Sequence, residues 1–136
     1  MNSTTLHTAG LVLVTVPTIE IGGMALLRFR TSKMPGYADN PLRRALFRAG
    51  HAHAGVLVIF ALVGLLYLDS ADLGKPWQTL ARVCLVLPPI LMPAGFFLSV
   101  TSPVATTPNR IITLVYAGAA ALATAAITLG VGLLAV

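Results

Sequence analysis

The chain has 136 residues, of which 57% are hydrophobic and only 10% are charged, and its mean hydropathy is +0.88. Soluble domains carry about a quarter charged residues, and a chain of this size cannot bury so much apolar surface inside itself. The composition therefore excludes an ordinary soluble domain and predicts an integral membrane protein. The net charge of +5 lies beside apolar segments, which favours a topology signal over nucleic-acid binding.

Four segments have the roughly 20 apolar residues that a membrane-spanning helix needs. They cover residues 8–27, 46–68, 77–100 and 109–136, with connections at 28–45, 69–76 and 101–108. We therefore expect an all-α fold, an integral membrane four-helix bundle that forms one domain over residues 1–136. The N-terminus lacks a signal-peptide pattern, so we expect an unprocessed chain.

The first span contains a proline and a carboxylate. Pro17 is expected to bend the helix. Glu20 lies seven residues before Leu27, which places it about 10 Å below the membrane surface. A carboxylate at that depth is costly unless it is paired, protonated or hydrated, and it marks a functional site by default. The alternative is a structural partner for a histidine or for Arg48.

The first connection carries most of the positive charge. The connection and the first residues of the next span hold six cations and one acidic residue, Asp39; the cations are Arg28, Arg30, Lys33, Arg43, Arg44 and Arg48. By the positive-inside rule, the connections at 28–45 and 101–108 face the cytoplasm, both termini lie outside, and the protein resides in the inner (plasma) membrane. A site for anionic lipid or an anionic substrate is the alternative.

The second span opens with the sequence GHAHAG at residues 50–55. Residues two apart on a helix point about 200° away from each other, so His51 and His53 cannot bind one small ion together. The small neighbours Gly50, Ala54 and Gly55 leave a smooth surface on which a flat macrocycle such as haem b can lie while one imidazole binds its iron. Alternatively, the small residues only serve helix packing and the histidines form hydrogen bonds at the end of the span.

The third and fourth spans complete the expected site. Prolines 88, 89 and 93 should loosen the third helix, and the single cysteine, Cys84, is expected to be a small core or lipid-facing residue. Phe96 and Phe97 come near the end of this span, and Asn109 and Tyr116 come near the start of the next. Polar and aromatic groups from all four helices lie at a similar depth, so we expect them to form one site, which comprises Glu20, His51, His53, Phe97, Ser99, Asn109 and Tyr116. The opposite half of the membrane should hold almost no polar groups.

Three short motifs resemble the styrene oxide isomerases, small four-span membrane enzymes. Ala52-His53-Ala54-Gly55 is similar to an Arg-Ala-His-Ser-Gly stretch of that family, although Arg48-Ala49 allows an alignment on His51 instead. Gly95-Phe96-Phe97-Leu98 resembles a Gly-Phe-Tyr-Leu stretch, and Pro108-Asn109 resembles a Pro-Asn pair.

The resemblance implies a homotrimer with haem b near the subunit interfaces and one histidine, His53 or His51, as the iron ligand. It also implies that ferric iron acts as a Lewis acid that isomerises an apolar aryl epoxide to an aldehyde. We also expect Phe96 and Asn109 to lie near the cofactor and Phe97 and Tyr116 to face the substrate, with Tyr116 chosen for its depth on the fourth span. Glu20, which has no counterpart in the family, would tune the site through a hydrogen bond to the other histidine or to a bound ligand. Membrane lipid would be the remaining partner.

Two departures from the family separate haem binding from isomerisation. Phe97 replaces a tyrosine, and residues 56–59 lack an asparagine found in the family. Three other functions are therefore kept open: a haem-binding electron-transfer subunit with two histidine ligands from different chains or helices, a small proton-coupled transporter that uses Glu20 and a histidine, and a scaffold without a ligand.

Overall fold

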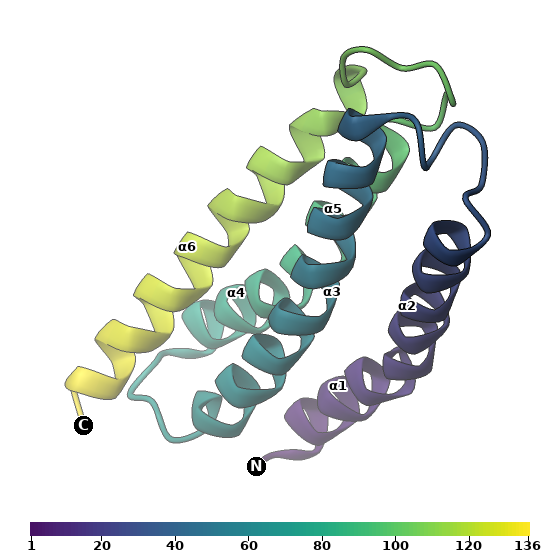
Figure 1. Ribbon diagram of the computed structural model, residues 1–136. Coiled ribbons are helices and arrows are strands. Elements are labelled where there is room, and N and C mark those ends of the chain that lie inside the picture. The colour runs from purple at the N-terminus through teal and green to yellow at the C-terminus, as the bar shows by residue number, and fades with distance from the viewer.

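The computed structural model describes residues 1–136 and is all-helical (Figure 1). Four helical segments are long and apolar enough to cross a membrane: Ser3–Thr31, Pro41–Leu68, Lys75–Leu98 and Arg110–Leu134. The first divides into α1 (Ser3–Val14) and α2 (Val16–Thr31), and the third into α4 (Lys75–Val86) and α5 (Pro88–Leu98). The second is α3 (Pro41–Leu68), and the fourth is a short 3-10 turn (Arg110–Ile112) followed by α6 (Thr113–Leu134). The expected four-helix membrane bundle is confirmed.

Two of the spans extend beyond the expected apolar windows because asparagine caps set where their helices begin. The side chain of Asn2 accepts a hydrogen bond from the backbone N–H of Thr5 at 2.8 Å, and Asn40 accepts one from Arg43 at 3.0 Å. Such caps satisfy backbone N–H groups that have no partner within the helix. The apolar window marks only the part of a helix that matches the hydrocarbon layer.

The breaks in the first and third spans occur beside prolines, as expected. α1 ends at Val14, three residues before Pro17, and α4 ends at Val86, two residues before Pro88. At the first break, the Thr15 hydroxyl donates to the Val12 carbonyl at 2.7 Å and the Thr18 hydroxyl donates to the Thr15 carbonyl at 2.6 Å. These hydroxyls satisfy backbone carbonyls where the helix is interrupted. Pro93, in contrast, lies inside α5 without ending it.

α6 packs against α5 through close backbone contacts. A Cβ atom added to Gly95 would lie 2.8 Å from the backbone nitrogen of Val115, and one added to Gly118 would lie 3.2 Å from that of Met92. Glycines allow membrane helices to approach this closely. The main core lies toward the chain termini and includes the buried Cys84.

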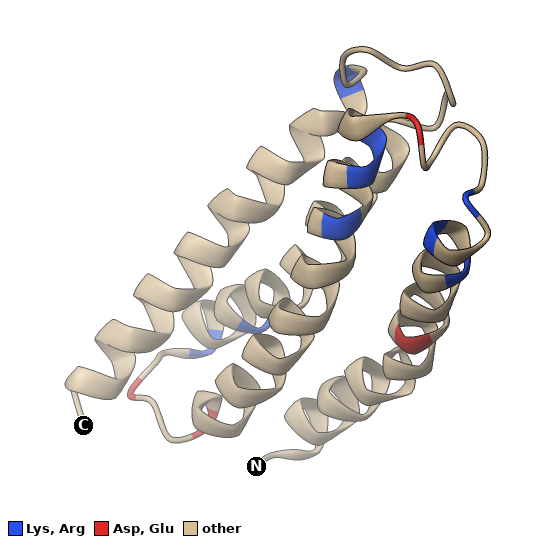
Figure 2. Ribbon diagram, viewed as in Figure 1, with Lys and Arg blue, Asp and Glu red and all other residues tan.

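The first and third connections lie at the same end of the bundle and are joined there. Asn40 donates to the carbonyls of Pro103 and Ala105 at 3.0 and 2.9 Å, and the guanidinium of Arg43 donates to the carbonyl of Val100 at 3.0 Å. Most Lys and Arg residues gather at this end (Figure 2). The charge asymmetry behind the expected orientation is therefore present in the folded chain, and the side that faces the cytoplasm stays a prediction.

Candidate functional site

The two histidines of α3 face different neighbours. A Cβ atom added to Gly23 would lie 3.0 Å from both Cε1 and Nε2 of His51, so the edge of this ring lies against the backbone of α2. The ring of His53 instead lies beside Phe96 of α5, with 4.9 Å between ring centroids and 42° between planes. This placement is consistent with the expectation that the two imidazoles cannot bind one ion together. The chain has no group of three or more His, Cys, Asp or Glu side chains placed to hold a metal ion.

The hydrogen bond of His53 fixes its tautomer. Its Nδ1 lies 2.7 Å from the carbonyl oxygen of Ala49, one turn earlier on α3. Because a carbonyl oxygen can only accept, Nδ1 carries the proton and Nε2 of the neutral ring keeps its lone pair. Histidines that bind metals generally donate their other N–H to a carbonyl or carboxylate in this way. His53 as a whole is half-buried.

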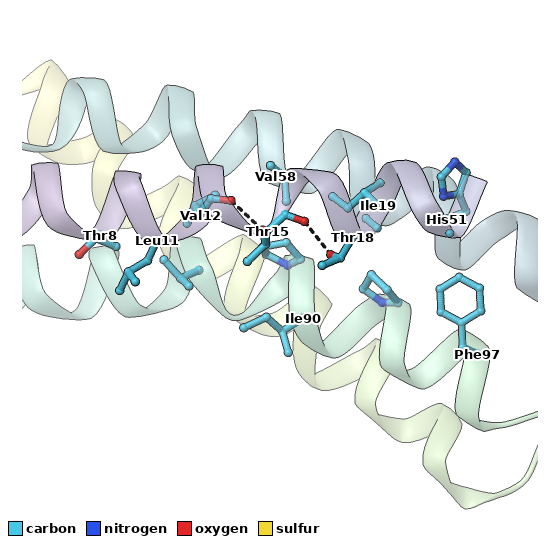
Figure 3. Close-up of a pocket in the computed structure, with 15 residues that line it drawn as sticks. Thr8, Leu11, Val12, Thr15, Thr18, Ile19, His51, Val58, Ile90 and Phe97 are labelled. Carbon is cyan, nitrogen blue, oxygen red and sulfur yellow. Dashed lines mark hydrogen bonds between the residues drawn. The ribbon is translucent and has the colours of Figure 1, made fainter. Parts of the chain in front are cut away.

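His51 lines an elongated apolar cavity of about 470 Å³ between the first span and helices α3, α4 and α5 (Figure 3). His51 and Phe97 lie at one end, and Thr8 and Leu11 lie toward the other. The hydroxyls of Thr8, Thr15 and Thr18 donate to backbone carbonyls of their own helices. The imidazole of His51 is therefore the polar side chain in the lining that has no hydrogen-bond partner in the chain.

The small residues around the histidines serve different purposes. A Cβ atom added to Gly50 would lie 3.1 Å from the Cβ of Phe96 and 3.1 Å from the ring of Phe97, so these two side chains fill the space that the glycine leaves. Ala54 is buried and forms part of the cavity wall. Only at Gly55 is there no atom within 4 Å of the added Cβ. The expectation that all these residues clear a surface for one macrocycle is therefore wrong for Gly50.

Glu20 and Tyr116 do not join either histidine within the chain. Tyr116 is 71% exposed, Glu20 is also exposed, and neither lines the cavity of His51. The rise per residue gives the depth of a side chain in the membrane but not the direction in which it points around the helix. The single cluster expected from depth therefore separates into the His51 cavity, the His53–Phe96 pair and two outward-facing side chains.

Asn109 and Ser99 form hydrogen bonds within the connection between α5 and α6. Asn109 accepts from the backbone N–H of Ile111 at 2.8 Å and donates to the carbonyl of Leu98 at 3.0 Å. The buried hydroxyl of Ser99 donates to the carbonyl of Phe96 at 3.2 Å. Both side chains position the third connection and the end of α5, which carries Phe96.

A polar cluster at the opposite end of the bundle was missed from the sequence. Asp69 accepts hydrogen bonds from the side chains of Asn2, Thr5 and Gln78 at 2.8, 3.0 and 3.2 Å, and Arg82 donates to the fully buried Thr5 hydroxyl at 3.3 Å. The expectation that this half holds almost no polar groups is therefore wrong. The signal was an arginine seven residues inside the third helix, because a membrane helix rarely carries an unpartnered charge.

No family model, curated protein or solved structure matches this chain.

Proposed function

We propose that this protein binds haem b in the membrane through His53 and isomerises an apolar, aryl-substituted epoxide to a carbonyl compound. The observation that carries the proposal is the 2.7 Å hydrogen bond from His53 Nδ1 to the Ala49 carbonyl. It leaves Nε2 as the lone-pair donor, which is the state that a histidine holding haem iron would require.

The surroundings of His53 fit a flat apolar group. Ala49, Val56 and Phe60 lie within two turns of His53 on α3, toward its outer face, and Val56 and Phe60 are 66% and 41% exposed. These side chains are apolar and leave no buried charge next to the cofactor. Phe96 packs beside the imidazole and restrains its rotation, so the ring is held ready for ligation.

His51 fits this role less well. Its Nε2 lies against the backbone of α2 at Gly23, and a macrocycle could reach that nitrogen only if α2 moved away. Between the two alignments with the styrene oxide isomerases, the geometry therefore favours His53. Because the two histidines face different sides of α3, they cannot both bind one haem within a chain, which argues against the electron-transfer subunit with two ligands from one chain. Glu20 faces outward, which argues against a transporter that relays protons between Glu20 and His51 of one chain.

When bound, ferric haem supplies an open coordination site that acts as a Lewis acid on an epoxide oxygen. The chain supplies the fixed imidazole and apolar surroundings that exclude water, so that an opened epoxide rearranges rather than adding water. Phe97 lies on the cavity side of α3 and Tyr116 points outward, so neither reaches the His53 side within one chain. As the family resemblance implies, the proposed assembly is a homotrimer.

The test compares two single substitutions on one helix. In mild detergent, His53→Ala should lose haem b and the isomerisation of an aryl epoxide, whereas His51→Ala should keep both. Circular dichroism should show the same helix content in each variant. Haem retained by His53→Ala at the level of the unsubstituted protein would refute the ligand assignment, and haem-loaded protein that leaves aryl epoxides unchanged would refute the enzymatic part alone.

A further inference from the structure

Four cations line one pocket at the charged end of the bundle, where the end of α2 lies beside the start of α3 (Figure 2). Arg30 and Lys33 come from the end of α2, Arg44 and Arg48 come from α3, and the pocket has a volume of about 430 Å³. No carboxylate lines this cationic pocket, and the only carboxylate in the first connection, Asp39, lines a different one. Like charges repel each other without a counter-charge, so the pocket is suited to an anion.

The two helices direct these cations toward their common contact. Arg48 follows Arg44 by one turn on α3, and the guanidinium of Arg44 donates a hydrogen bond to the Ala38 carbonyl at 2.8 Å. On α2, Arg30 comes seven residues, or about two turns, after Gly23, which packs against α3. Arg30 therefore lies on the face of α2 that is turned toward α3.

Lys33 occupies a backbone position that favours glycine. Its φ is +48°, and it directly follows Ser32, the C-cap of α2. The backbone N–H of Met34 donates to the Phe29 carbonyl at 3.0 Å, and that of Lys33 donates to the Arg30 carbonyl at 3.3 Å. This is the Schellman pattern, in which glycine usually takes the left-handed position because it does so without strain. The turn therefore does not explain the lysine, whereas an anion in the pocket does.

The apolar cavity lined by His51 lies next to the cationic pocket, deeper in the membrane. Arg48 precedes His51 by three residues on α3, which is about 4.5 Å along the axis. The cavity then follows the first span from Gly22 to Thr8, 14 residues or about 21 Å further along. One leaflet is half of a hydrocarbon layer of about 30 Å, so the cavity is long enough for an extended acyl chain.

The order of chemical groups along α3 matches that of a glycerophospholipid. Cations come first, then the imidazole of His51 without a hydrogen-bond partner, and then apolar side chains. In the lipid, the phosphate is followed by ester carbonyls, which accept hydrogen bonds, and then by acyl chains. Guanidinium groups donate paired hydrogen bonds to phosphate oxygens. A free phosphate ion would match only the first of these three zones.

We propose that the contact between α2 and α3 binds one anionic glycerophospholipid of the membrane, with its phosphate in the cationic pocket and one acyl chain in the His51 cavity. The net negative charge of the headgroup offsets the four cations. This inference goes beyond the proposed function, because the lipid touches neither His53 nor a haem bound there.

Native mass spectrometry of the protein in mild detergent, with phosphatidylglycerol or phosphatidylcholine added, measures the binding. The unsubstituted protein should retain one phosphatidylglycerol and far less phosphatidylcholine, whose choline group is repelled by the cations. Arg30→Gln/Arg48→Gln should bind phosphatidylglycerol about 30-fold more weakly. Protein that retains no phosphatidylglycerol, or retains both lipids equally, would overturn the proposal.

The matched control is Arg28→Gln/Arg110→Gln. It removes two positive charges from the same end of the bundle, but neither residue lines the cationic pocket. This control should bind phosphatidylglycerol as tightly as the unsubstituted protein. If the control lost as much affinity as Arg30→Gln/Arg48→Gln, the lipid would be attracted by the general surface charge, and the assigned site would be wrong.

Two further comparisons separate folding from binding and a lipid from a soluble phosphate. Lys33→Gly should unfold at an equal or higher fraction of sodium dodecyl sulfate, because glycine suits the φ of +48°, and yet should bind phosphatidylglycerol about fivefold more weakly. Unchanged binding would remove Lys33 from the site. Glycerol 3-phosphate, which has the phosphate but no acyl chain, should not displace the lipid; displacement would overturn the lipid as occupant and indicate a site for a soluble phosphate.

Discussion

Replacing Gly95 by alanine should destabilise the bundle, because the added methyl group has no space at the contact between α5 and α6. The Cβ atom would lie 2.7 Å from Val115 Cγ2 and 2.8 Å from the Val115 backbone nitrogen. A side chain can rotate away, but a backbone nitrogen within a helix cannot. Because ordinary contact begins near 3.4 Å, α6 would have to move away by about 0.6 Å.

The expected loss of stability follows from two opposing contributions. Overpacking a well-packed contact costs about 1–3 kcal/mol, whereas replacing glycine by alanine within a helix contributes about 1 kcal/mol in the opposite direction. The net loss in the free energy of unfolding is therefore about 0–2 kcal/mol, centred near about 1 kcal/mol. Gly130→Ala is the matched control, because its added Cβ meets no atom within 4 Å, and it should leave stability unchanged or raise it by up to about 1 kcal/mol.

Reversible unfolding of the purified protein in sodium dodecyl sulfate, followed by far-ultraviolet circular dichroism, measures both variants. Gly95→Ala should unfold at a lower detergent fraction than the unsubstituted protein, and Gly130→Ala at an equal or higher one. If Gly95→Ala were as stable as the unsubstituted protein while Gly130→Ala were less stable, the described contact between α5 and α6 would be wrong.

Asn40→Ala removes the cap of α3 and two hydrogen bonds to the third connection. It should lower the free energy of unfolding by about 1–3 kcal/mol and speed proteolysis of residues 101–108. Unchanged proteolysis would contradict the described link between the first and third connections. Asp69→Ala removes the acceptor shared by Asn2, Thr5 and Gln78; it should accelerate hydrogen exchange in α1 but not in α6, and equal acceleration in both helices would show that the cluster does not act locally. Phe96→Leu removes the ring beside His53 and should weaken haem retention more than Phe97→Leu; the reverse order would place the cofactor on the His51 side.

The topology could be predicted from the sequence because it depends on segment length and average polarity. Four apolar windows, short connections and prolines at the breaks led to the four spans and to the interruptions near Pro17 and Pro88. The ends of the helices were less predictable, because caps such as Asn2 and Asn40 extend helices beyond the apolar windows.

The depth of the candidate residues was also predictable, but their direction was not. The contacts of Gly23 with His51, Gly50 with Phe96 and Gly95 with Val115 place Glu20, His53 and Tyr116 within about one turn of the same height along the bundle. Which of them face inward depends on how each helix rotates to bury its most apolar or smallest face. α6 is apolar and small almost all round, so its pattern does not reveal that Tyr116 points outward.

The glycines illustrate a further limit of the sequence. Gly50 and Gly55 look equivalent beside the histidines, yet Phe96 and Phe97 occupy the space at Gly50 while no atom lies within 4 Å of the added Cβ at Gly55. Only contacts between residues distant in the chain distinguish a glycine that receives a neighbour from one that faces open space. The cluster around Asp69 depends on similarly distant contacts, since it joins the N-terminus to α3 and α4.

An absorption spectrum of the protein purified in mild detergent, recorded oxidised and then reduced, tests haem binding most directly. We predict a strong Soret band with one haem b per chain, and a ferric spectrum typical of iron with one histidine ligand and an open position. A protein that stays colourless after incubation with hemin would contradict the proposal that His53 holds haem.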